Sequence, residues 1–322
     1  MLWLTWRQHR LQLLTTVLVF GAIAAYLIPA SREIVAFANT VDPSCFTGGT
    51  AGCGSLLDGR YDSDPTTIKQ LLLLSNLLPA IVGAFWGAPL VAREFERGTY
   101  RLAWTQGVAP VRWVAVKLVV LVLGAAAGGA AAAVLFGWAV SGWRITGGVH
   151  RFREWWVFDL VGVVPILMWP SALLLGVATG LVIRRTAAAM AVSLVLFGAL
   201  IVGLAQLRAH YATPEVRPAG VSAAAAGSFA DDWELGKAVL DGSGKTVAAD
   251  GACPAWHREA PDGPVIVGRD AACLQRHGWR EVVYYQPESL FWRFQWTQAG
   301  VETAGAAVVA AFILVRVRRR AW

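Results

Sequence analysis

Residues 118–140 read LVVLVLGAAAGGAAAAVLFGWAV, a run without a single charged side chain. A helix that crosses a membrane needs roughly 20 mainly apolar residues, because a rise of ~1.5 Å per residue must cross ~30 Å of hydrocarbon. This run is long enough, and five other segments meet the same test. The predicted spans are Leu11–Ala30, Leu71–Val91, Leu118–Val140, Leu160–Ile183, Thr186–Leu207 and Trp296–Val315. The sequence therefore predicts an all-α polytopic membrane protein with six transmembrane helices.

The composition agrees with a membrane protein and also indicates its orientation. The 322 residues are 56% hydrophobic and 15% charged, whereas a soluble domain is about 25% charged. The net charge of +7 could suggest a nucleic-acid partner. However, with the N-terminus inside, the short inner segments hold many basic residues and two acids, Glu94 and Glu96, whereas the outer segments spread their basic residues over longer loops. This positive-inside pattern predicts a plasma-membrane protein with both termini in the cytoplasm, and no nucleic-acid partner.

The chain divides into three parts. Residues 1–207 hold an N-terminal interfacial helix and spans one to five, with a cytoplasmic loop at 92–117. Residues 208–295 form a polar outer segment, long enough for a small extracytoplasmic domain. Residues 296–322 hold the sixth span and a basic cytoplasmic tail. Arg184 and Arg185 leave almost no loop between spans four and five, which predicts a tight cytoplasmic hairpin.

The first ten residues, MLWLTWRQHR, are too polar to insert into a membrane and unusually aromatic. Trp3 and Trp6 can lie at the level of the lipid headgroups while Arg7 and Arg10 face water. This pattern predicts an interfacial helix that precedes the first span.

The four cysteines all fall in predicted outer loops. Cys45 and Cys53 lie in the first outer loop, and Cys253 and Cys273 lie in the last. An even number on one face suits an oxidising compartment and two local disulfides, although four free thiols are the alternative. A metal site is disfavoured because CxxC spacing is absent.

Three of the predicted spans carry pairs of glycines four residues apart. The pairs are Gly83 with Gly87, Gly124 with Gly128, and Gly176 with Gly180. This spacing permits close approach of helix backbones. We favour packing within one subunit over a specific dimer face.

Catalytic motifs are weak. The stretch Gly242-Ser-Gly-Lys-Thr246 resembles the end of a phosphate-binding loop, but Val239 stands where that motif needs its first glycine. A turn is the better interpretation. Among the spans and their ends, Asp159 and Glu302 are ionisable, and both lie near the outer ends rather than at mid-depth, which argues against a proton-coupled carrier or an intramembrane protease. We expect a chain that is not an enzyme and holds no cofactor.

The inner loop between spans two and three carries the richest side-chain chemistry. Residues 92–106 read AREFERGTYRLAWTQ, and Thr99 can cap a short helix. On that helix Arg97, Tyr100, Arg101 and Trp104 share one side. A cationic, aromatic face suits docking to a protein, but it also suits contact with anionic lipid headgroups. The candidate partner-binding residues are Glu94, Phe95, Glu96, Arg97, Gly98, Thr99, Tyr100, Arg101, Leu102 and Trp104.

Residues 87–106, GAPLVAREFERGTYRLAWTQ, followed by Arg112-Trp113 and Lys117-Leu118, resemble the permease subunits of ABC-2 type exporters, especially their short actinobacterial branch. The opening WLTWRQHR at 3–10 and YQPESLFWRFQ at 285–295 are similar to that branch too. The stretch Gly107–Pro110 departs from the polar run expected there. The resemblance thus covers both ends and the middle of the chain.

The resemblance implies a permease without its own ATPase, which works as a homo- or heterodimer on two cytoplasmic ABC ATPase subunits. ATP and magnesium would bind to those partners. Residues 1–10 would be the elbow helix, and residues 94–106 would contain the coupling helix. The implied function is export of a hydrophobic or amphipathic compound. The alternative from the residues alone is a membrane sensor or assembly protein with a ligand-binding outer cap and a cytoplasmic docking loop.

Overall fold

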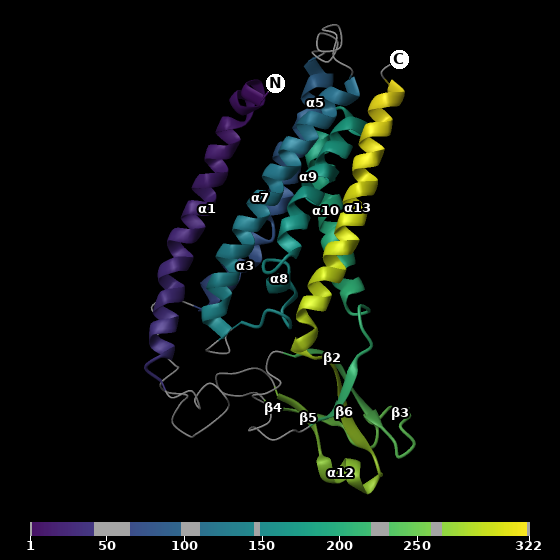
Figure 1. Ribbon diagram of the computed structural model, residues 1–322. Coiled ribbons are helices and arrows are strands. Elements are labelled where there is room, and N and C mark those ends of the chain that lie inside the picture. Colours follow the sequence, from purple (N-terminus) through teal and green to yellow (C-terminus); the bar gives the residue numbers. More distant parts are fainter. Residues whose placement is uncertain are drawn as a thin grey trace.

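The computed structural model describes residues 2–41, 65–97, 110–144, 149–219, 232–258 and 266–320. Long helices form an elongated bundle, and a small β-sheet lies beyond one end of it (Figure 1). The N-terminal end of the first helix and the C-terminal end of the last lie at the opposite end (Figure 1). We call these the sheet end and the terminal end of the bundle.

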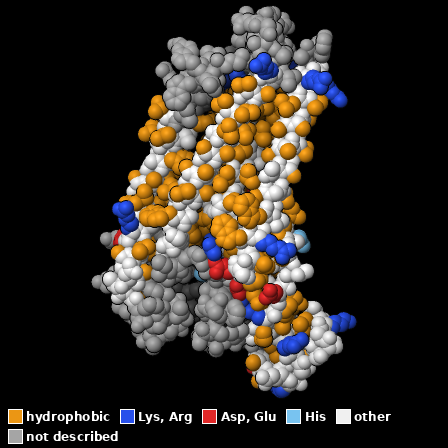
Figure 2. Space-filling model, viewed as in Figure 1, with side chains coloured by type: hydrophobic (Ala, Val, Ile, Leu, Met, Phe, Trp, Pro, Cys, Tyr) orange, Lys and Arg blue, Asp and Glu red, His pale blue; other side chains and the backbone are white. Residues whose placement is uncertain are grey.

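Six helical segments in the described part of the chain are long and apolar enough to cross a membrane, which confirms the predicted number. They cover Leu14–Ala38, Thr67–Glu96, Val114–Gly142, Val164–Ile183, Thr186–Arg208 and Glu288–Arg319. Large apolar side chains such as Leu18, Val134, Val195 and Val308 are exposed on four of them. Hydrophobic side chains cover the bundle between its ends, and charged side chains gather toward the two ends (Figure 2). Lipid tails can cover such a surface, because they are as apolar as the side chains that face them.

The helices extend beyond the predicted spans. α1 covers Leu2–Ala38 without interruption, although the sequence predicts a separate interfacial helix up to residue 10. α7 covers Pro110–Arg144 and α13 covers Phe291–Arg320. Backbone hydrogen bonding continues past the apolar run, so hydropathy marks the membrane-crossing part of a helix and not its ends.

The second span is built from four consecutive elements: α3 (Pro65–Ser75), α4 (Leu78–Val82), a π-helical turn η2 (Gly83–Gly87) and α5 (Ala88–Arg97). Next to them lies α9 (Val164–Ile183), the most buried span. α9 contacts α4, η2, α5, α7, α13 and α10 (Thr186–Arg208). α1 packs against α7 at the side of the bundle (Figure 1). The core therefore forms around α9.

Glycines bring the second span and α9 into backbone contact. A Cβ atom added at Gly176 would lie 1.9 Å from the carbonyl oxygen of Gly83, and one at Gly87 would lie 2.4 Å from that of Leu173. A Cβ atom at Gly180 would lie 2.3 Å from the carbonyl oxygen of Ala88. For these two glycine pairs, packing within one subunit is confirmed. At Gly124 a Cβ atom would meet nothing within 4 Å, so this glycine makes no such contact in the described chain.

Residues 215–286 contain strands, so the prediction of an all-α protein is wrong for this segment, while the chain as a whole is mostly helical. β1 (Glu215–Pro218), β6 (Arg280–Gln286), β2 (Trp233–Leu240) and β3 (Thr246–Val247) form an antiparallel sheet in that order. β4 (Ala255–Arg258) and β5 (Ile266–Arg269) form a second antiparallel pair. Hydropathy averaged over a window long enough for a span does not register short strands.

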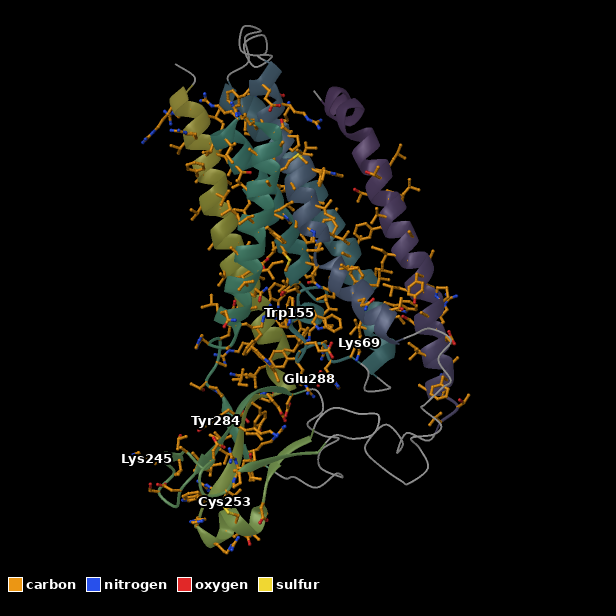
Figure 3. The ribbon with its side chains drawn as sticks, turned by 180° about the vertical axis from the view of Figure 1, so that it is seen from behind. Lys69, Trp155, Lys245, Cys253, Tyr284 and Glu288 are labelled. Atoms are coloured by element: carbon orange, nitrogen blue, oxygen red, sulfur yellow. A yellow bond between two sulfur atoms is a disulfide. The ribbon has the colours of Figure 1, made fainter. Side chains whose placement is uncertain are left out.

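A disulfide joins Cys253 to Cys273 beneath the sheet, which is the later of the two pairs proposed from the sequence (Figure 3). Cys273 belongs to the short helix α12 (Ala271–Arg276). The two sulfur atoms and a ring nitrogen of His277 lie within 4.8 Å of one another, but the disulfide leaves no thiolate to hold a metal ion. Cys45 and Cys53 lie outside the described residues.

The stretch that resembles a phosphate-binding loop is the turn between β2 and β3, as expected. One carboxylate oxygen of Asp241 accepts hydrogen bonds from the backbone N–H groups of Ser243 and Lys245 and from the Ser243 hydroxyl. Gly244 adopts φ +84°, which favours glycine. Since Asp241 already occupies these N–H groups, they do not form a cradle for phosphate. The same hydrogen bonds lower the pKa of Asp241.

Candidate coupling site

The candidate site lies where α5 ends, at the terminal end of the bundle (Figure 1). Of the ten candidate residues, Glu94, Phe95 and Glu96 lie on the last turn and a half of α5 with their side chains described, and Arg97 is its last residue. Gly98, Thr99, Tyr100, Arg101, Leu102 and Trp104 lie outside the described residues. The structure therefore describes the base of the loop: the end of α5 and the start of α7.

An ion pair joins the two helices that flank the loop. The Nζ atom of Lys117 on α7 lies 2.9 Å from Oε1 of Glu94 on α5 and donates a hydrogen bond to it. Both side chains are largely buried, at 12% and 22% exposure. Charge-assisted hydrogen bonds contribute about 1.5–3 kcal/mol, more than an exposed pair would. This pair fixes the distance between the ends of the loop.

Glu96 joins α5 to the start of α10. Its Oε1 accepts a hydrogen bond from the backbone N–H of Thr186 at 2.8 Å, and its Oε2 accepts one from the Thr186 hydroxyl at 2.6 Å. Thr186 is the first residue of α10, and the preceding Arg185 provides no side-chain cap. A helix N-terminus has unsatisfied N–H groups and a partial positive charge, so a carboxylate stabilises it. Glu96 thus caps α10 from another helix.

Phe95 contacts the turn between α9 and α10. The guanidinium carbon of Arg184 lies 5.0 Å from the centre of the Phe95 ring, a cation–π distance. Arg184 ends α9 with φ 59°, a left-handed conformation that terminates the helix. α10 begins two residues later, which confirms the predicted tight hairpin.

The contacts described for Glu94, Phe95 and Glu96 therefore join parts of the same chain, and partner binding by these residues stays a prediction. Sequence reasoning missed their partners Lys117, Arg184 and Thr186. Lys117 had a detectable signal, since an acid and a base flank one loop. No local pattern pairs Glu96 with a threonine ninety positions away.

This arrangement can transmit a displacement. The loop is covalently attached to α5 and α7, and Glu96 and Phe95 attach the end of α5 to the α9–α10 turn. α5 also packs backbone to backbone on α9. A force applied to the loop would therefore reach four helices directly.

The candidate elbow residues lie at the same end of the bundle. Trp3, Trp6, Arg7 and Arg10 belong to the first turns of α1, and their side chains are not among those that the structure describes. Their predicted interfacial role stays a prediction.

Comparison with known protein families identifies the family of this chain. The family model described as "ABC-2 membrane transporter related" matches residues 16–208, more than half of the chain. The match covers the spans from α1 to α10 and both helices that flank the loop, and it ends before the sheet. No curated protein and no solved structure matches the chain. The chain therefore belongs to the ABC-2 related family of membrane transporters, whose permeases are non-catalytic transport components that work with ATPase partners.

Proposed function

We propose that this chain is the transmembrane permease subunit of an ABC exporter, in which residues 94–106 transmit ATP-driven movement from a separate ATPase subunit to the helix bundle. The cargo would be a hydrophobic or amphipathic compound. ATP and magnesium would bind to the ATPase, and this chain would hold no cofactor.

The observation that carries the proposal is the set of contacts at the base of the loop. Glu94 joins α5 to α7, and Glu96 joins α5 to α10. A loop that only rested on lipid headgroups would not need such links. A loop that transmits movement does, because a force is lost wherever the helices that receive it move independently.

We assign the terminal end of the bundle to the cytoplasm. Both termini and the end of α5 lie there, and the positive-inside pattern puts these segments inside (Figure 1). The sheet would then be extracytoplasmic, which suits its disulfide. The beginning of α1 would act as the elbow helix at the inner membrane surface.

A second copy of the chain, or a related permease, would complete the transporter. The cargo would pass between the two permeases, as the resemblance to exporter permeases implies. Apolar residues exposed on α10, such as Val195 and Val202, are available for contact with lipid or a second permease.

The test is to express the chain together with the genes beside its own and to purify it by a tag on its C-terminus. We expect an ATPase with Walker motifs to co-purify. Tyr100→Ala should weaken ATPase binding by about thirtyfold, equivalent to a loss of ~2 kcal/mol at an interface hot spot. Arg93→Gln is the matched control, because Arg93 is an exposed cation on α5, before the loop, and its removal tests attraction to lipid.

Charge reversal tests the transmission. Glu94→Lys and Lys117→Glu should each lower the hydrolysis that transported compounds stimulate, and the double variant should restore it because the ion pair re-forms with reversed polarity. If Arg93→Gln is as harmful as Tyr100→Ala, or the double variant fails to recover, the loop is not the coupling element. If no ATPase co-purifies, a membrane sensor or assembly protein is the better interpretation.

A further inference from the structure

A cluster of buried polar side chains lies at the sheet end of the bundle, far along the chain from the coupling loop. It contains Asp159, which follows the short helix α8 (Trp155–Phe158), Arg208, the last residue of α10, and Gln298 and Glu302, one turn apart on α13. Their exposures are 3%, 1%, 0% and 4%. Figure 3 labels Trp155, the first residue of α8, at the junction between bundle and sheet. Three separate elements thus bring ionisable groups together in the interior.

Arg208 is fully engaged. Its Nη2 donates to Oδ1 of Asp159 at 2.5 Å, and its Nε and Nη2 donate to Oε1 of Gln298 at 3.1 and 2.9 Å. Its Nη1 lies 3.4 Å from the carbonyl oxygen of Trp155, and its guanidinium carbon lies 3.9 Å from the centre of the Phe158 ring. One positive charge is therefore paired with one negative charge, that of Asp159.

Gln298 connects this pair to Glu302. Its Nε2 donates to Oδ1 of Asp159 at 3.0 Å and to Oε1 of Glu302 at 3.1 Å. An amide nitrogen has two hydrogens, so both are used. Glu302 therefore accepts one hydrogen bond, from an uncharged amide donor.

The second oxygen of Glu302 has no hydrogen-bond partner among the residues that the structure describes. Its Oε2 atom is buried and makes no hydrogen bond within the described part of the chain, and the same holds for the hydroxyl of Tyr211. Tyr211 lies three residues beyond Arg208, and the centre of its ring lies 5.5 Å from that of Phe294, one turn before Gln298 on α13. The charges of Asp159 and Arg208 act on Glu302. Of the other helices that pack on α13, α9 has no titratable side chain, and the described charged side chains of α7, Arg112 and Lys117, lie near its first residues, at the terminal end of the bundle.

Counting charges gives an imbalance. With two ionised carboxylates and one guanidinium, the cluster has a net charge of −1, and its side chains are buried from solvent. A buried, singly hydrogen-bonded carboxylate is costly, and the usual outcome is that the group takes up a proton. Protonation removes the buried charge and turns this oxygen from an acceptor into an O–H donor.

We propose that Glu302 is a proton-binding site, and that its bound proton neutralises the cluster and holds α13 against α10 and the α8–α9 turn. Loss of this proton would leave an uncompensated buried charge, and would favour an arrangement in which α13 moves so that Glu302 reaches water. The site is distinct from the coupling loop and independent of the function proposed above.

The test uses the purified full-length chain in nanodiscs and infrared spectroscopy of the carbonyl stretch of a protonated carboxylic acid. At neutral pH the parent should show this band, because exposed carboxyl groups are ionised there. Glu302→Gln should abolish it. Asp159→Asn should abolish it too, since the guanidinium of Arg208 would then balance an ionised Glu302. Glu33→Gln, in α1, removes a carboxyl group outside the cluster and should keep the band.

A second measurement does not depend on how well the Asp159 variant assembles. Unfolding releases the proton of Glu302, so raising the pH should favour the unfolded state of the parent by up to about tenfold in the equilibrium constant per pH unit. Glu302→Gln, which has nearly the same shape and no proton to lose, should lower this slope by the contribution of one proton. The proposal is overturned if the parent lacks the band, or if the band survives in either cluster variant. It is also overturned if the band appears only when sodium and potassium are removed, because a cation would then occupy the site in place of the proton.

Discussion

Gly176→Ala is the substitution for which the structure gives the most definite consequence. The new Cβ atom would lie 1.9 Å from the carbonyl oxygen of Gly83, 2.8 Å from its carbonyl carbon and 3.0 Å from the backbone nitrogen of Ala88. All three are backbone atoms, so no side chain can rotate away. Since real Cβ contacts do not fall below 3.0 Å, the second span and α9 would have to separate by about 1 Å.

The cost follows from the position of α9. Overpacking a core typically costs about 1–3 kcal/mol, and we expect the upper end here because α9 packs against most of the other spans. For a domain of this size that corresponds to a fall in melting temperature on the order of 5–10 °C. The separation would also move α5, so stimulated ATP hydrolysis should fall with stability.

Gly124→Ala is the matched control, because it is the same substitution in another span and its Cβ atom would meet nothing within 4 Å. Thermal unfolding of both variants in detergent, followed by circular dichroism and by size-exclusion chromatography, should show a loss for Gly176→Ala alone. Equal melting temperatures would refute the close packing of α9 on the second span. A loss for Gly176→Ala that appears only at concentrations where dimers form would instead assign this glycine to a contact between copies.

Three further outcomes are expected. Glu96→Ala should destabilise the chain by about 1 kcal/mol, the usual contribution of a helix cap, whereas Glu96→Gln should retain part of that stabilisation. Equal melting temperatures of both variants and the parent would argue against the cap on α10. Cys253→Ser should destabilise the sheet by up to ~3.3 kcal/mol, from the chain-entropy model for the loop that the disulfide with Cys273 closes. Backbone hydrogen exchange in the sheet should become faster while the melting temperature of the bundle stays unchanged. Unchanged hydrogen exchange would contradict this prediction. A cysteine introduced at Gly242 should react with an impermeant thiol reagent in intact cells, whereas one at Arg185 should not, and the reverse pattern would invert our orientation.

Parts of the candidate site could be predicted from the sequence. The richness of the loop in arginine and aromatic residues is visible locally, and Glu94 and Glu96 stand out as the acids of a basic inner segment. Their roles could not be predicted in the same way. Glu94 was a candidate for binding another protein, but its described partner is Lys117, and Glu96 contacts the first residue of α10.

In the polar cluster, too, single residues were recognisable from the sequence but their contacts were not. Asp159 and Glu302 were recognisable as ionisable residues near the outer ends of spans, but they are 143 positions apart, and nothing in the sequence pairs them. Arg208 is the first residue of the predicted outer segment, and no sequence pattern marks it. It is among the most buried side chains that the structure describes, because α8, α10 and α13 converge on it.

The sequence by itself determined the number of spans, the tight α9–α10 turn and the presence of glycines for close packing. Each of these depends on neighbouring residues, since the transfer of an apolar run into lipid and the termination of a helix are local events. The strands at 215–286 and the partners of Glu96 and Arg208 were decided by the tertiary structure alone. A hydrogen bond or ion pair between distant residues depends on the distance between helices, and that distance is set by how all the spans pack around α9.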